Sequence, residues 1–333
     1  MAEAKYDVLG IGNAIFDVLV KTDEKFLSRH GMIKGGMSLI DEARAASIYR
    51  DMGPATEMSG GSAANTVVGI AGFGARAAYV GKVKDDQIGR LYAHDIRAAG
   101  VAFDTSPASD GPATGCSYIL VTDDGERTMN TYLGAAQELT ADDIDADKVA
   151  GARIIYLEGY LWDPKSAKEA FVKAATIAHG AGREVALTLS DAFCVDRYRD
   201  EFLELMRKRT VDLVFANEAE LHSLYQTSDF DTALKELRKD TKLGVVTRSE
   251  KGCVVVSDDG VVAVPAFAID RLVDTTGAGD LFAAGFLVGL VRNAGYENAG
   301  RLGALAAAEV IQHIGARPLV SLKELAKKNG LPV

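Results

Sequence analysis

Short runs of apolar residues alternate along this chain with longer segments in which apolar residues recur at helical spacing. The runs that predict buried strands cover residues 8–11, 77–80, 153–157, 184–189, 211–215 and 243–247. The segments that predict helices cover residues 63–72, 87–99, 166–179, 201–208 and 218–225. Buried strands that alternate with helices are typical of a largely parallel sheet covered on both faces, so the pattern predicts an α/β fold.

Two regions depart from this alternation. Residues 16–40 contain a strand candidate, a polar turn and a second short strand. Residues 113–133 contain two strand candidates on either side of Asp123-Asp124-Gly125, which is a hairpin signal. We therefore expect one α/β domain over residues 1–333, with a small β lid inserted at about 13–42 and 112–135. A pair of irregular edge hairpins is the alternative interpretation of the same two regions.

Composition limits the classes of protein to which the chain can belong. Apolar residues make up 48% of the chain and charged residues 25%, which is ordinary for a globular protein with a substantial core. A net charge of −10 repels phosphate-rich polymers, so nucleic acid is not an expected partner. The longest apolar run, 282–291, is too short to cross a bilayer, and the N-terminus lacks the features of a signal peptide. We therefore expect a cytoplasmic protein with no membrane partner.

Residues 274–280 read Asp-Thr-Thr-Gly-Ala-Gly-Asp and lead directly into the apolar helical segment 281–287. The glycines should therefore lie at or just before a helix N-terminus, where free backbone N–H groups and the helix dipole attract an anion. Asp280 stands beside this anion site, and a carboxylate there suits a general base for a hydroxyl that attacks a phosphoryl group. Alternatively, Asp274 or Thr275 simply caps the helix.

Two further stretches place polar groups where a ligand could bind. Residues 60–65, Gly-Gly-Ser-Ala-Ala-Asn, predict a tight turn that enters a helix, with Asn65 able to pair with hydroxyl groups. Asn13 and Asp17 follow the first strand, and at the carboxyl edge of a parallel sheet they suit the vicinal hydroxyls of a sugar. A strand end with an incidental Asp is the alternative.

Together these motifs resemble the two signatures of the pfkB-type carbohydrate and nucleoside kinases, also called the ribokinase family. Residues 217–220, Asn-Glu-Ala-Glu, resemble the Asn-x-x-Glu motif of that family and equally suit a helix capping box. Residues 247–252 resemble its Thr-x-Gly-x-x-Gly nucleotide loop, with Ser249 in place of the usual Gly. The resemblance covers nearly the whole chain and implies a ribokinase-like three-layer sandwich with a mostly parallel central sheet and a small β lid.

The resemblance also implies an ATP-dependent kinase that uses Mg²⁺, and it is compatible with a monovalent cation such as K⁺. Asp280 would be the catalytic base, while the backbone of Gly277, Ala278 and Gly279 would hold charge on the γ-phosphoryl group. Glu220 would act on Mg²⁺ through water. The residues that the resemblance assigns to the nucleotide are Asn217, Thr247, Arg248, Gly252, Thr275, Gly277, Gly279 and Arg127 of the lid.

Within the family the chain is most similar to the adenosine kinase branch, which implies transfer to the 5′-hydroxyl of adenosine. The residues that would bind the sugar are Asn13, Asp17, Gly60, Gly61 and Asn65. The residues that would contact the base are Ile15, Met37, Leu39, Leu133 and Leu161, for most of which ordinary core packing is the alternative. A sugar kinase acting on ribose, fructose or a related sugar, an inosine or guanosine kinase, and a catalytically silent nucleoside- or sugar-binding regulator remain alternative functions. The partners implied are small molecules only, and both a monomer and a homodimer remain open.

Overall fold

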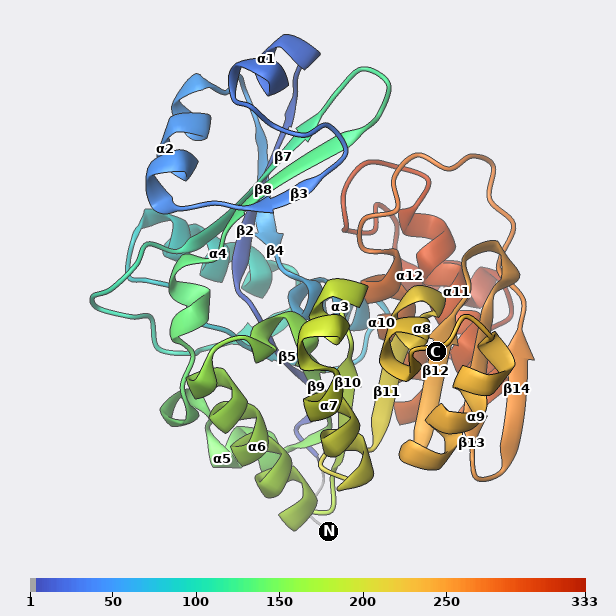
Figure 1. The fold of residues 1–333 in the computed structure, drawn as a ribbon. Coiled ribbons are helices and arrows are strands. Elements are labelled where there is room, and N and C mark those ends of the chain that lie inside the picture. The colour runs from blue at the N-terminus through green and yellow to red at the C-terminus, as the bar shows by residue number, and fades with distance from the viewer. Residues whose placement is uncertain (1–3) are drawn as a thin grey trace.

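The computed structural model describes residues 4–333, and two β-sheets organise them (Figure 1). The larger sheet has nine strands in the order β14-β13-β12-β11-β10-β9-β1-β5-β6. The strands from β12 to β6 are parallel, and the hairpin β13–β14 adds an antiparallel edge. In chain order its strands are β1 (Tyr6–Ile11), β5 (Ala77–Val80), β6 (Val101–Phe103), β9 (Ala152–Glu158), β10 (Glu184–Thr188), β11 (Leu213–Asn217), β12 (Leu243–Thr247), β13 (Cys253–Ser257) and β14 (Gly260–Val264).

Helices cover both faces of this sheet and enclose two hydrophobic cores. Successive side chains of one strand serve opposite cores, since Val8 packs with one and Leu9 with the other. The helices on the Val8 face are α3 (Ser62–Gly72), α4 (Gln87–Ala98), α10 (Ala278–Val291), α11 (Tyr296–Val310) and α12 (Leu322–Lys328). Those on the Leu9 face are α5 (Ala146–Ala150), α6 (Lys165–Gly180), α7 (Ala192–Arg207), α8 (Glu218–Tyr225) and α9 (Phe230–Asp240). The result is the three-layer α/β sandwich that the sequence pattern predicts.

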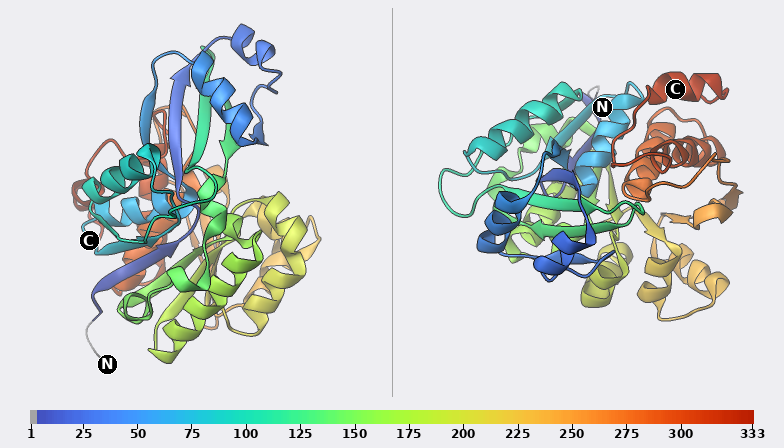
Figure 2. Two further views of the ribbon diagram at one scale, coloured as in Figure 1. Left: turned by 90° about the vertical axis from the view of Figure 1, so that its left-hand side faces the viewer. Right: turned by 90° about the horizontal axis from the view of Figure 1, so that it is seen from above.

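The smaller sheet is the lid, and it projects from the edge of the body (Figure 2). Its five strands run in the order β3-β8-β7-β2-β4. The elements of the lid are β2 (Ile15–Lys21), α1 (Glu24–Arg29), β3 (Met37–Leu39), α2 (Glu42–Asp51), β4 (Thr56–Gly60), β7 (Gly115–Val121) and β8 (Arg127–Tyr132). The lid sheet therefore extends beyond the predicted segment 13–42, because β4 pairs with β2.

The two faces of the lid sheet differ in what they contact. Phe16 and Val18 are buried in the same core as Ile48 of α2 and Tyr92 of α4. Val20 forms a smaller cluster with Phe26 and neighbouring apolar residues. The residues that alternate with these, such as Ile15 and Asp17, face the body. The outer face is thus covered by helices, and the inner face is left for the site.

Most predicted elements are confirmed, and two differ. Helix 218–225 and strand 243–247 have the predicted bounds. The helix expected at 201–208 begins at Ala192 instead, where Asp191 accepts a hydrogen bond from Cys194 N at 2.6 Å. The polar turn expected within 16–40 holds the short helix α1, which Asp23 caps in the same way. In both cases an Asp N-cap, which the sequence analysis did not use, begins the helix. Nowhere in residues 4–333 does a helix combine the length and apolar character needed to span a membrane.

Candidate active site

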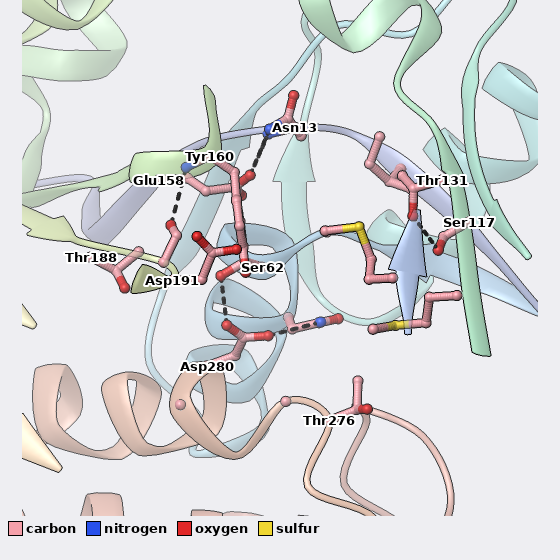
Figure 3. A pocket seen from close by; sticks show the side chains of 18 of the residues that line it. Asn13, Ser62, Ser117, Thr131, Glu158, Tyr160, Thr188, Asp191, Thr276 and Asp280 are labelled. Carbon is pink, nitrogen blue, oxygen red and sulfur yellow. Dashed lines mark hydrogen bonds between the residues drawn. The ribbon is translucent and has the colours of Figure 1, made fainter. Parts of the chain in front are cut away.

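A cavity of about 700 Å³ lies between the inner face of the lid and the carboxyl ends of the parallel strands (Figure 3). Asn13 follows β1, Thr188 ends β10, and Thr247 ends β12, so the site lies where ligands bind in open α/β sheets. Most of the residues predicted for a site line it together. They are Asn13, Ile15, Asp17, Met37, Leu39, Gly61, Asn65, Leu133, Asn217, Glu220, Thr247, Thr275, Gly277, Gly279 and Asp280.

Asp280 lies in the first turn of α10 and is held by the first turn of α3. Its Oδ1 accepts a hydrogen bond from Ser62 Oγ at 2.6 Å, and its Oδ2 accepts one from Asn65 Nδ2 at 3.0 Å. Burial raises the pKa of Asp280 to about 6, although these two bonds and the positive charge of Arg317 act in the opposite direction. The carboxylate is therefore ionised at neutral pH but basic enough to accept a proton.

The turn before α10 presents free backbone N–H groups. Gly277 has a left-handed backbone (φ 78°), and a Cβ there would lie 2.7 Å from Ala316 Cβ, so this position requires glycine. Within residues 4–333, the N–H groups of Gly277, Gly279 and Asp280 meet no acceptor. The N–H of Ala278 donates to Thr275 O at 3.2 Å and is already engaged. Of the three N–H groups predicted for an anion site, those of Gly277 and Gly279 are therefore free, that of Ala278 is engaged, and that of Asp280 is a further free donor.

A buried carboxylate that the sequence did not reveal forms the floor of the cavity. Glu158, at the end of β9, is 1% exposed and accepts hydrogen bonds from Asn13 Nδ2 and Ala63 N, both at 2.8 Å. Burial raises its pKa to about 7 against the effect of these donors. Asn13 also accepts a bond from Gln137 Nε2 at 3.2 Å. Its side-chain amide is therefore fixed in orientation and retains one N–H for a ligand.

Asp17 contributes a carboxylate from the lid to the cavity. It lies beside Ser117 of β7, which in turn lies beside Thr131 of β8, and the hydroxyls of Ser117 and Thr131 are 2.8 Å apart. Burial raises the pKa of Asp17 to about 7, while Arg317 and Arg127 lower it. None of the side-chain hydrogen bonds within residues 4–333 ends on the Asp17 carboxylate, so its oxygens are available to hydroxyls of a ligand.

The predicted sugar-site glycine Gly60 does not line the cavity but lies behind Asp17. A Cβ on Gly60 would lie 2.2 Å from Asp17 Oδ2. The absent side chain thus makes room for the Asp17 carboxylate, and the role of Gly60 in a sugar site is indirect.

The remainder of the inner lid face is apolar. Met37 and Leu39 of β3 are 49% and 57% exposed, and Phe193 at the start of α7 is 78% exposed. All three line the cavity, so these exposures describe apolar surface that is open to a ligand. The other apolar residues that line the lid side are Ile15, Ile119, Met129 and Leu133.

Leu161, which was predicted to contact the base, lies elsewhere. The 3₁₀ helix Gly159–Trp162 turns Tyr160 toward the cavity and buries Leu161 in the core beneath α6 and α7. The periodicity of a strand end cannot reveal this rotation. Leu161 is therefore a core residue, as the packing alternative required.

The predicted nucleotide residues divide into two groups. Asn217 and Thr247 line the cavity, whereas Arg248 forms an ion pair with Glu218 at 2.8 Å and lies 3.6 Å from the centre of the Phe230 ring. These contacts hold Arg248 away from the cavity. Gly252 is required by the backbone, since a Cβ there would lie 2.0 Å from Val264 O.

The loop at the end of β12 keeps the shape expected of its motif despite one substitution. Ser249 stands where the resemblance expects glycine, and it has a left-handed backbone (φ 51°). It therefore adopts the conformation that glycine would favour there. The loop contains the short 3₁₀ helix Ser249–Lys251.

Arg127 of the lid contacts the loop that leads into the anion site. Its Nη2 lies 2.8 Å from Asp274 Oδ2, and the two side chains are 9% and 3% exposed. Asp274 also accepts hydrogen bonds from Thr276 N at 3.0 Å and Gly315 N at 2.9 Å. Asp274 thus orders the turn that precedes the helix and binds the lid through Arg127. It does not cap the helix, because the N-cap is Gly277 and no side chain makes a capping hydrogen bond there, so the capping alternative is wrong.

The site offers few side chains that could bind a metal ion directly. Glu220 is 4% exposed, and its two oxygens accept hydrogen bonds from Asn217 N at 3.0 Å and Asn217 Nδ2 at 2.6 Å. Burial raises its pKa to about 7. Nowhere in residues 4–333 do three or more His, Cys, Asp or Glu side chains gather to hold an ion. Glu220 therefore fits a role at one remove from Mg²⁺, through water, better than direct ligation.

Several lining residues were not predicted from the sequence, among them Ser62, Glu158, Tyr160 and Phe193. Ser62 lies inside the predicted turn 60–65, so its hydroxyl was a signal that could have been used. Glu158 and Tyr160 follow strand β9, and their place depends on β9 lying next to β1. A sequence pattern does not give that strand order.

Comparison with known proteins agrees with this geometry. Residues 52–322 match the pfkB family carbohydrate kinase profile. Adenosine kinase from Saccharomyces cerevisiae is 29% identical over 92% of this chain and 94% of its own, and Fructokinase-1 from Zea mays is 30% identical over 70% and 74%. Among solved structures, adenosine kinase from Sinorhizobium meliloti is 56% identical (TM-score 0.91, covering 98% of this chain and 100% of its own). A probable sugar kinase protein from Rhizobium etli CFN 42 is 53% identical (TM-score 0.92, 99% and 100%). The chain belongs to the pfkB family of carbohydrate kinases and is an ATP-using phosphotransferase with an alcohol group as acceptor.

Proposed function

We propose that this enzyme transfers the γ-phosphoryl group of ATP to the 5′-hydroxyl of a nucleoside, with adenosine as the acceptor and AMP as the product. The apolar inner face of the lid carries this proposal. Met37, Leu39 and Phe193 offer open apolar surface in the same cavity as Asp17 and Asp280. A flat purine would bury this surface, whereas a free sugar would leave it in water.

The polar groups of the cavity suit the ribose of that nucleoside. The carboxylate of Asp17 accepts hydrogen bonds from the sugar diol, and the remaining N–H of Asn13 donates to it. Asn65 and Gly61 complete this part of the site. The sugar is then held with its terminal CH₂OH group directed toward Asp280.

Asp280 accepts the proton of that hydroxyl as its oxygen attacks the γ-phosphorus. Ser62 and Asn65 hold the carboxylate in place, so the base is oriented before the acceptor binds. The N–H groups of Gly277 and Gly279, at the positive end of α10, bind the negative oxygens of the transferring group. The lid covers the acceptor and excludes water, which limits hydrolysis of ATP.

The other end of the cavity suits the nucleotide. Asn217, Thr247 and Thr275 line it from the ends of β11 and β12 and from the turn before α10. Bound Mg²⁺ would neutralise charge on the phosphates, and Glu220 would orient its water ligands.

A sugar kinase is the second candidate, and a specific observation favours it. Glu158 and Asn13 give the cavity a polar floor that grips any polyol, with or without a base. Fructokinase-1 from Zea mays and the probable sugar kinase protein from Rhizobium etli CFN 42 are among the similar proteins. A silent sensor is less well supported, because it has no need of an oriented base.

The test is ATP consumption with Mg²⁺ present, measured with adenosine, inosine, guanosine, ribose and fructose in turn. We expect kcat/KM for adenosine to exceed that for ribose or fructose by about 100-fold or more, since the base adds buried apolar contacts. Preference for ribose or fructose would establish a sugar kinase. Binding of adenosine without turnover of any acceptor would establish the sensor.

A further inference from the structure

Arg317 lies in the loop after α11 and touches two of the segments that build the cavity. Its Nη2 donates to Ser59 Oγ at 3.0 Å and to Ser59 O, and its Nη1 lies 3.5 Å from Ala64 O. Ser59 precedes the Gly60-Gly61 turn, and Ala64 follows it in the first turn of α3. One guanidinium therefore ties together the two sides of the turn that carries Ser62 and Asn65.

The rest of the same loop holds the anion turn. Gly315 N donates to Asp274 Oδ2 at 2.9 Å, and Ala316 packs against Gly277, where even a Cβ would not fit. Three consecutive residues, 315–317, thus contact both sides of the catalytic carboxylate. Asp280 bonds to Ser62 and Asn65 on the Arg317 side and follows Gly277 on the other.

Arg317 is also placed among carboxylates. Asp95 of α4 binds the other side of Ser59, accepting from Ser59 N at 2.7 Å and from Ser59 Oγ at 2.5 Å. The charges of Asp17, Asp95 and Asp280 all act on the guanidinium. Arg127 is the second cation that acts on Asp17, but Arg317 is the cation that acts on both Asp17 and Asp280.

We propose that Arg317 is a positioning residue for phosphoryl transfer: it fixes the Gly60-Gly61 turn and supplies the positive charge that Asp17 and Asp280 share. It touches neither reacting atom and acts through the two aspartates. The inference rests on the kinase roles given above to those aspartates, and it adds a cation that opposes the effect of burial on the pKa of both carboxylates. Without a cation between them, like charges in one cavity raise each other's pKa.

The sign of the effect follows from the groups that face these aspartates. Loss of the Arg317 charge removes an influence that lowers the pKa of Asp17 and of Asp280, while the burial of both and the charge of Asp280 on Asp17 remain. Both pKa values therefore rise, and the protonated form of Asp280 cannot accept the hydroxyl proton. The titratable groups that interact electrostatically with Arg317, Asp17 or Asp280 are Tyr79, Tyr92, Asp95, Cys116, Arg127, Tyr156, Glu158 and Tyr160.

The experiment compares Arg317→Met, Arg317→Gln and Arg317→Lys with the wild-type enzyme across pH 5.5 to 9, using whichever acceptor the wild type phosphorylates best. The acid limb of kcat/KM should move up by about one pH unit in the Met and Gln variants. Activity should then fall about fivefold more at pH 6 than at pH 8.5. Arg317→Lys should keep the wild-type limb but raise KM for the acceptor, because an ammonium lacks the fork that reaches Ser59 and Ala64.

Arg292→Met is the matched control, since Arg292 is exposed at the far end of α10 from Asp280 and should leave the profile unchanged. Arg317→Gln retains an amide donor and keeps the test available if Arg317→Met does not fold. A purely structural Arg317 would lower activity equally at every pH, and that result would overturn the proposal.

A second measurement needs no turnover. In protein labelled with ¹³C at the aspartate carboxyls, the resonance missing from Asp280→Asn belongs to Asp280. Its titration midpoint should rise in Arg317→Gln and stay in place in Arg292→Met; an unmoved midpoint contradicts the proposal. Because any acceptor serves, a preference for fructose would defeat the proposed function and leave this test intact. An unmoved Asp280 midpoint in an enzyme that prefers adenosine would contradict the role of Arg317 and leave the proposed function intact.

Discussion

The floor of the cavity and the inner face of the lid are built on opposite principles. The floor is polar and internally bonded: Asp280 is held by Ser62 and Asn65, and Glu158 by Asn13 and Ala63. The lid face is largely apolar, and its side chains Met37 and Leu39 are half exposed. A bonded floor fixes the position of the chemistry, whereas an open apolar face adapts to the acceptor. The reaction is therefore easier to infer than the substrate.

Replacement of Asp280 by Asn should have the largest effect, because it removes the base and keeps the shape. We expect kcat to fall about 10³-fold, with KM for the acceptor changed little. Steady-state kinetics with purified protein checks this, and the control is Asp270→Asn in an exposed loop. Turnover near the wild-type rate would show that Asp280 is not the base and that the residues of the cavity floor do not carry out the reaction.

Replacement of Asp17 by Ala should have a smaller effect and a different form. Asp17 is the carboxylate that the lid contributes, so its loss should raise KM for the acceptor by about 10- to 100-fold and lower kcat much less. The measurement is acceptor saturation at fixed ATP, with the KM for ATP as the internal control. If the acceptor KM stays constant, Asp17 does not contact the sugar, and the lid binds the acceptor through apolar contacts alone.

Replacement of Leu39 by Asn tests the apolar face alone and should have the smallest effect. It should lower kcat/KM for adenosine about tenfold, because a polar group would meet the base, and leave kcat/KM for ribose nearly constant. Ile33→Asn provides the control, since Ile33 lies in the same lid segment, is 78% exposed and does not line the cavity. Equal losses with adenosine and ribose would show that the lid face does not distinguish acceptors.

The comparison also explains what could be predicted from the sequence. The turns at 60–65 and 274–280 are local structures, so glycines followed by a helical pattern were sufficient to predict them. The family resemblance was needed to place Asn65 and Asp280 in one site with Asp17, and all three line one cavity. Glu158 was missed because its role depends on β9 lying beside β1, which is a property of strand order. Leu161 was placed wrongly because a single 3₁₀ turn exchanges the directions of Tyr160 and Leu161.

Arg248 shows a third limit. The loop that carries it was recognised, but the partners that draw its side chain away, Glu218 and Phe230, lie on two different helices. Long charged side chains are directed by such tertiary contacts, which spacing along the chain does not contain. Backbone-determined features of the same loop, such as the left-handed residue at Ser249, follow the motif more faithfully.

The path of the chain between body and lid has a mechanical consequence. It crosses four times: from β1 to β2 through residues 12–14, from β4 to α3 at Gly61, from β6 to β7 through residues 104–114, and from β8 toward the body at Leu133. Residues of the first, second and fourth crossings line the cavity. If the lid moves by rotation about these crossings, the axis lies beside the cavity. Displacement grows with distance from an axis of rotation, so such a motion would move the hairpin tip near Gly125 most and Asp17 least. Such a motion could admit and release a ligand while the residues near the axis stay aligned with it.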